Sequence, residues 1–356
     1  MVLIHGAPAR PTAPDAVADR PLLAWLLAAA AVWQIGAHVD AWYHAHRGFA
    51  IESFLTWPHA LLYAGWLAVC LVALPLGRAE PAPAPGTRLA LAGAALFGVG
   101  GLLDFAWHQA FGFEASLATL FSPSHVWLVA SALVTAVGVL AAAVDRRRLR
   151  ARAGRAGARD GLVVALALAF VLRLSRYLLF YSEPLSVDYA SGGAIAGRLP
   201  SAAVMGWGTV AAQVAGTTGI VLHSVLLALF VLVGLRRLRL PAGGLALVLG
   251  WDALLTAAVD DLWRYLPAVA AAAVAGELLW ALVRRGLLGG PDAAAGYWLI
   301  AAVVPAVQFD AYFALMAAYD GIIWPIHLWA GVPIVAALYG LIVSLLLLPP
   351  RWLGRD

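Results

Sequence analysis

Ten apolar segments, each long enough to cross a bilayer, constrain this chain more than any other feature. A helix needs about 20 mostly apolar residues to cross the hydrocarbon core. Apolar residues make up 63% of the 356 and charged residues 12%, whereas soluble domains have about 45–50% and 25%. These values exclude a soluble fold and predict an all-α, polytopic transmembrane bundle of about ten helices. The predicted spans are 21–43, 57–76, 88–108, 123–144, 161–181, 207–235, 241–259, 264–284, 293–316 and 324–348.

The basic residues, all of them arginines, predict the orientation of the bundle. Eighteen of the 23 lie in segments 1–20, 77–88, 145–160, 236–239, 284–285 and 351–355, that is, in both tails and in every second loop. By the positive-inside rule, both termini are cytoplasmic and the helices form repeated outward hairpins in the cell membrane. No aromatic residues are interleaved with the arginines, which argues against a nucleic-acid partner. Lone Cys70 argues against disulfides and thiolate metal sites. We also expect no removable targeting peptide at the N-terminus.

The loops and an internal repeat divide the chain into five parts. Two homologous helical hairpins come first, followed by the remaining transmembrane helices, which include a degenerate third copy of the hairpin at 293–348. The parts are an N-terminal cytoplasmic tail (1–20), the two hairpins (21–144), an Arg-rich cytoplasmic loop (145–160), the other helices (161–348) and a C-terminal cytoplasmic tail (349–356).

The repeat is visible in the polar residues of the first two hairpins. The first hairpin has Asp40 and His44 near the end of its odd helix and Pro58-His59 at the start of its even helix. The second has Asp104 and His108, followed by Pro123-Ser124-His125. Glu52 and Glu114 occupy similar places in the two linkers. An internal duplication explains this correspondence better than chance does.

This spacing suits metal binding. Asp and His four residues apart lie on one face of a helix, and a proline at the start of the next helix leaves the following His in its first turn. Each hairpin can therefore bring together one carboxylate and two imidazoles, a set that suits copper, zinc or iron. A bound cation would also offset the cost of Asp in a membrane span, about 2.5–3.5 kcal/mol. We predict two metal sites towards the outer face, Asp40/His44/His59 and Asp104/His108/His125. A structural Asp–His pair or a proton relay is the alternative at each.

Weaker candidates lie in the third copy and in the linkers. Asp310 has Ala314 where the other copies have His, although Trp324-Pro325-Ile326-His327 still resembles the start of the even helix. Asp310, His327 and Asp320 could form at most a weaker site. Glu52 and Glu114 are further possible ligands.

Other polar residues in or near the spans have simpler interpretations. His38 and His46 are either extra ligands or capping and interfacial groups, and His223 is expected to be a core histidine. The charged residues expected to form interhelical ion pairs, with a proton or anion path as the alternative, are Arg173, Arg176, Asp260, Asp261 and Arg264.

The second hairpin resembles a known family. Asp104-Phe105-Ala106-Trp107-His108-Gln109 and Phe121-Ser122-Pro123-Ser124-His125 resemble the intramembrane copper motif in the C subunit of copper membrane monooxygenases, the particulate methane and ammonia monooxygenases. The resemblance covers about 70 residues. It implies copper ligation by Asp104, His108 and His125, and it relates the stretch from Asp310 to His327 to the family's neighbouring site. The Asp40/His44/His59 hairpin has no counterpart in the family that we can place.

The resemblance suggests a copper-dependent monooxygenase subunit that oxidises a small apolar substrate with O2, working with other membrane subunits or as a homo-oligomer. The sequence leaves three alternatives open. The triads could serve a transporter or a cation or proton permease, histidines on adjacent helices could hold a haem, or the chain could be a structural membrane subunit.

Overall fold

The computed structural model describes the chain except for residues 1–21, 48–55, 78–84, 114–116, 192–208 and 351–356. The described residues form helices and no β-sheet, so the predicted all-α bundle is confirmed. The ten predicted spans correspond to α2 (Leu22–Arg47), α3 (Trp57–Gly77), α4 (Pro85–Phe111), α6 (Pro123–Arg152), α7 (Ala158–Tyr177), α10 (Thr209–Leu232), α11 (Gly244–Val259), α12 (Leu266–Arg284), α13 (Ala294–Tyr319) and α15 (Val332–Leu347).

Shorter helices lie at the ends of the long ones. They are α5 (Ala118–Phe121), η1 (Phe180–Ser182), the π-helical turn η2 (Val233–Arg237), η3 (Trp263–Tyr265) and α14 (Ile326–Trp329). The last predicted span is therefore interrupted, because α14 ends before α15 begins. Within the described residues, eight helices are long and apolar enough to cross a membrane. The chain is thus a multi-pass membrane protein, while α11 is shorter and α7 carries buried charges.

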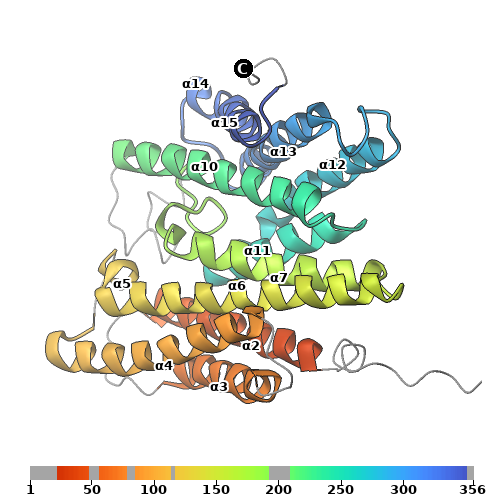
Figure 1. The fold of residues 1–356 in the computed structure, drawn as a ribbon. Coiled ribbons are helices and arrows are strands. Elements are labelled where there is room, and N and C mark those ends of the chain that lie inside the picture. The colour runs from red at the N-terminus through yellow and green to blue at the C-terminus, as the bar shows by residue number, and fades with distance from the viewer. Residues whose placement is uncertain (1–21, 48–55, 78–84, 114–116, 192–208, 351–356) are drawn as a thin grey trace, which may run out of the picture.

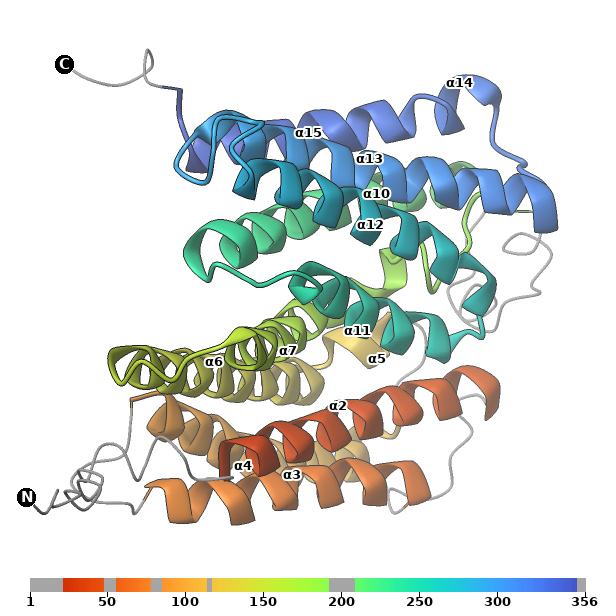
Figure 2. The same ribbon diagram turned by 90° about the vertical axis from the view of Figure 1, so that its right-hand side faces the viewer.

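The helices run side by side in alternating directions, and neighbours in sequence are mostly neighbours in space (Figures 1 and 2). The closest pairs are α2 with α3, α4 with α6, and α13 with α15, each a hairpin of the predicted kind. The fifth and sixth spans differ, because α7 packs mainly on α6 and α11 rather than on α10. Figure 1 shows α7 and α11 between an N-terminal group (α2, α3, α4 and α6) and a C-terminal group (α10, α12, α13 and α15).

Glycines let the backbones of the paired helices approach closely. A Cβ atom at Gly138 of α6 would lie 2.2 Å from the backbone nitrogen of Ala90 in α4, and one at Gly65 of α3 would lie 2.5 Å from the backbone nitrogen of Trp33 in α2. Small residues serve this purpose between membrane helices, where close van der Waals packing drives association. The two hairpins are therefore held at short spacing, and this spacing sets the positions of their polar ends.

We expect Gly138→Ala to destabilise the protein, because its Cβ would collide with the α4 backbone and force α4 and α6 apart. Overpacking of this kind costs about 1–3 kcal/mol. Gly250→Ala is the matched control, since a Cβ there meets no atom within 4 Å. Thermal unfolding of the detergent-solubilised variants tests this, and equal melting temperatures would contradict the close packing.

Candidate metal centre

The same local structure places the second histidine of each hairpin. Thr56 directly precedes α3, and its hydroxyl accepts a hydrogen bond from the backbone N–H of His59 at 3.5 Å. Ser122 is the N-cap of α6, and its hydroxyl accepts from the backbone N–H of His125 at 3.4 Å. Such N-cap bonds satisfy a backbone donor that the first helical turn leaves without a partner. Both histidines therefore lie at the third helical position, with their rings directed at the preceding helix.

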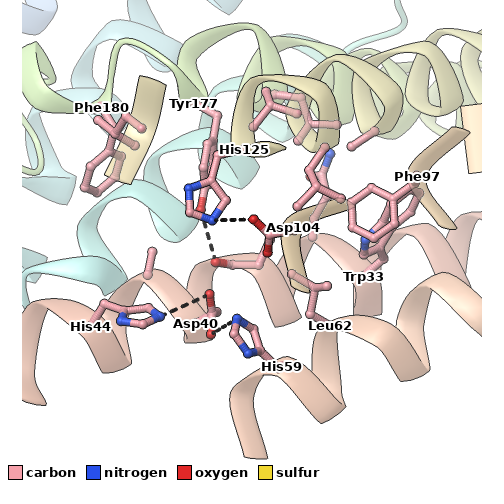
Figure 3. A pocket seen from close by; sticks show the side chains of 18 of the residues that line it. Trp33, Asp40, His44, His59, Leu62, Phe97, Asp104, His125, Tyr177 and Phe180 are labelled. Atoms are coloured by element: carbon pink, nitrogen blue, oxygen red, sulfur yellow. Dashed lines mark hydrogen bonds and ion pairs between the residues drawn. The ribbon is translucent and has the colours of Figure 1, made fainter. Parts of the chain in front are cut away.

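The first triad forms between α2 and α3. His59 Nε2 lies 3.5 Å from Asp40 Oδ1, and His44 Nε2 lies 3.7 Å from Asp40 Oδ2. The side chains are 14–17% exposed. Figure 3 shows both imidazoles directed at the Asp40 carboxylate. The structure thus brings together the three residues predicted from the first copy of the repeat.

The second triad, between α4 and α6, is tighter and more buried. His108 Nε2 and His125 Nε2 lie 3.4 Å and 3.3 Å from the same oxygen, Asp104 Oδ1. The side chains of Asp104 and His108 are 3–4% exposed, and that of His125 is 25% exposed. In each triad, one ligand atom from each residue lies within 4.8 Å of the other two. All six residues could therefore contribute ligand atoms, three to each of two metal ions.

The hydrogen bonding at His108 shows why a cation fits. His108 Nδ1 lies 3.3 Å from the carbonyl oxygen of Gly112. A carbonyl only accepts hydrogen bonds, so Nδ1 carries a proton, and in the neutral ring Nε2 would present a lone pair to Asp104. An Nε2 lone pair and a carboxylate oxygen are both hydrogen-bond acceptors. They attract each other only when a positive charge, either a proton or a metal ion, lies between them.

The distances also suit a metal. Two ligand atoms at 2.0–2.1 Å from one tetrahedral ion are about 3.3 Å apart, and the Nε2–Oδ1 distances at Asp104 are 3.3 and 3.4 Å. The buried Oδ1 atoms of Asp40 and Asp104 accept no hydrogen bond from the described residues. Within that part of the chain, both carboxylates form ion pairs with histidines alone.

Both triads line a single cavity of about 200 Å³. The rest of its wall is mainly apolar and includes Trp33, Leu62, Phe97, Leu128, Ala132 and Phe170. Tyr63 also lines the cavity and lies close enough to Asp40 and Asp104 to interact electrostatically with both. Figure 3 shows Asp104 above Asp40, with Trp33 and Phe97 to the right of both. Metal ions at the two triads would share this apolar chamber.

Within the described residues, the weaker candidates of the third copy do not join a site. Asp310 and His327 are both exposed and belong to no Asp/His group that the described residues could offer to a metal. Asp320 instead accepts a hydrogen bond from Arg264 Nε at 2.7 Å. The third copy of the repeat thus retains the sequence pattern without forming a ligand set. Glu52 and Glu114 lie outside the described residues.

The neighbouring histidines have other partners. His38 is buried, and its Nδ1 lies 2.7 Å from the Gln34 carbonyl oxygen. His46 forms an ion pair with Asp261 at 3.0 Å. Neither belongs to the two Asp/His groups. His46, exposed near the end of α2, therefore matches the capping or interfacial alternative, whereas His38 is a buried residue bonded to its own helix.

Sequence reasoning missed the acidic partners of the buried arginines. Arg176 of α7 donates hydrogen bonds to Glu183 at 2.8 Å, to Asp252 of α11 and to His223 Nδ1 at 2.7 Å. Arg173 lies 3.3 Å from Asp252. The predicted ion pairs at Arg173 and Arg176 are confirmed, and His223 is a core histidine within this charged cluster. Asp252 could have been found from sequence, because an acid in the middle of an apolar span needs a partner.

This charged cluster supports the cavity. Phe170, Leu174 and Tyr177 of α7 line the cavity, while the intervening Arg173 and Arg176 bind α11. The ion pairs therefore fix the helix that closes one side of the chamber.

Comparison of the chain with models of known protein families, with curated proteins and with solved structures finds no match.

We expect Asp252→Asn to destabilise the protein by about 3–5 kcal/mol, because it leaves buried arginine charge without its partner. Asp261→Asn is the control. It also removes an Asp charge from an ion pair, but that side chain is 56% exposed, so we expect a loss of less than about 1 kcal/mol. Denaturant titration of the solubilised variants measures both, and a small effect at Asp252 would show that the cluster is not what holds α7.

Proposed function

We propose that this protein is a membrane metalloprotein in which each Asp/His/His triad binds one transition-metal ion at the edge of a shared apolar cavity. The observation that carries the proposal is the convergence of His108 Nε2 and His125 Nε2 on Asp104 Oδ1 in a buried site. A second triad of the same composition, in a second copy of the hairpin, strengthens it. A structural Asp–His pair would need only one histidine per carboxylate.

Copper is the metal we propose first. Carboxylate and imidazole ligands alone do not discriminate between copper, zinc and iron. Copper is favoured by the resemblance of the Asp104–His125 region to the motif of the copper membrane monooxygenases. Copper bound there would supply one-electron and O2 chemistry.

The protein's own residues would bind and orient the ions. Asp40 and Asp104 would offset the metal charge. The hydrogen bond to Gly112 would hold the His108 ring in the tautomer that coordinates through Nε2. The apolar wall formed by Trp33, Phe97 and Leu128 would admit a small apolar substrate. We therefore propose an oxidation function, with electrons supplied by other membrane subunits.

Metal content tests the proposal. We expect the protein, purified in nanodiscs and loaded with copper, to hold two copper ions per chain by inductively coupled plasma mass spectrometry. His59→Ala and His108→Ala should each lower this to one, because each removes a ligand from a different triad. His327→Ala is the matched control, since this histidine is exposed and lies outside both triads.

Other outcomes are equally informative. Zinc or iron retained at the same stoichiometry in protein purified without added metal would support the two sites but contradict copper. Failure of the wild-type protein to retain metal after loading would contradict the proposal as a whole. Loss of both ions in either variant would show that the two triads form one cluster rather than two separate sites.

A further inference from the structure

A second polar site, separate from the triads, lies near the end of α13. Its centre is Asp188, in a segment (182–191) that is buried throughout. Irregular backbone at membrane depth is tolerated where protein surrounds it. Here it is tied to the connection after α13, because Ile323 N–H donates to the Ala190 carbonyl at 2.9 Å. The segment therefore holds an acidic side chain inside the protein.

The hydroxyl of Tyr265 links this buried acid to a surface acid. Tyr265 Oη lies 2.7 Å from Asp188 Oδ2 and 2.6 Å from Asp320 Oδ2. The Asp188 side chain is 0% exposed, whereas that of Asp320 is 24% exposed. The three groups thus form a continuous line from the interior to the surface.

The two hydrogen bonds among Asp188, Tyr265 and Asp320 need one more proton than the Tyr265 hydroxyl supplies. Both oxygen–oxygen distances are those of full O–H···O hydrogen bonds, and each bond needs its own proton. The Tyr265 hydroxyl supplies one. The other would come from a carboxyl group.

The surrounding charges indicate which acid carries the proton. Arg264 Nε donates to Asp320 at 2.7 Å, while its Nη2 lies 3.7 Å from Asp188. The other polar groups facing Asp188 within the described residues are neutral: the hydroxyl of Tyr312, which donates at 3.2 Å, and that of Ser191. Arg264 can neutralise the charge of one carboxylate, and it lies closer to Asp320 than to Asp188. Asp188 would therefore be the neutral acid.

We propose that Asp188, Tyr265 and Asp320 form a proton-binding site in which Asp188 holds an exchangeable proton and Tyr265 connects it to the surface. The Asp188 proton moves to Tyr265 Oη as the tyrosine proton moves to Asp320 Oδ2, from which water removes it. Burial also raises the pKa of Asp188, as a protonated acid requires. The site shares no residue with the triads and does not depend on metal binding. It would suit a proton-coupled step of the protein.

Infrared spectroscopy of the whole protein in nanodiscs tests the bound proton. We expect the carbonyl stretch of a protonated carboxylic acid at pH 7, with that band lost in Asp188→Asn and lost from the wild type as the pH rises. Asp320→Asn should move the loss to lower pH, because it removes a neighbouring negative charge and frees Arg264 for Asp188. This variant alters a partly exposed side chain, so the test survives if Asp188→Asn fails to fold. A wild-type spectrum without such a band would overturn the proposal, as would a band unchanged in Asp188→Asn.

Exchange into D2O tests the connection to the surface. We expect the carboxyl band to shift more slowly in Tyr265→Phe than in the wild type, because the phenyl ring cannot pass a proton. Tyr319→Phe is the matched control. It removes the hydroxyl of a tyrosine that is the last residue of α13, is 64% exposed and does not belong to the proposed site. Equal exchange rates in Tyr265→Phe and the wild type would rule out the tyrosine relay.

Discussion

A charge inside this bundle has almost no water to solvate it, so each buried ionic group must find its compensation within the protein. Moving a carboxylate into such an interior costs several kcal/mol even after relaxation. The structure meets this demand in three different ways. Arginines compensate Glu183 and Asp252, an arginine and a shared proton would compensate Asp188 and Asp320, and the ion pairs of Asp40 and Asp104 within the described residues are with histidines.

The charge balance of each cluster distinguishes a structural role from a ligand-binding role. Arginine remains protonated under all ordinary conditions, so the cluster around Arg176 is balanced without any ligand and its role is to join α7 to α11. The triads have no permanent cation. Imidazole is neutral over much of the physiological pH range, and in the neutral ring the protonated Nδ1 of His108 would leave its Nε2 lone pair facing a carboxylate. Among the described residues no arginine pairs with either triad, so a proton or a metal ion would supply the positive charge.

Much of the fold and most of the site could be predicted from sequence, because both depend on local spacing. Helical spans follow from runs of apolar residues, and an Asp and a His four residues apart must share a helical face. The Thr56 and Ser122 caps then fix His59 and His125. The packing of α7 against α11 and the burial of segment 182–191 could not be predicted, because they depend on contacts between distant residues such as Arg176 with Asp252. The misjudged role of Asp320 has the same origin, since its partners Arg264 and Tyr265 lie more than 50 positions away.

The packing of the first two hairpins explains why their triads face one cavity while the predicted third copy does not contribute. In the first two copies, glycines bring the paired helices close together, so that an Asp from one helix lies within reach of a His at the start of the next. The two hairpins also pack on each other, α3 against α4, which directs their polar ends into a common space. In the third copy, Asp310 lies on the exposed side of α13, and His327 lies on α14, which ends before α15 begins. A ligand set therefore requires the orientation of the odd helix as well as the sequence pattern.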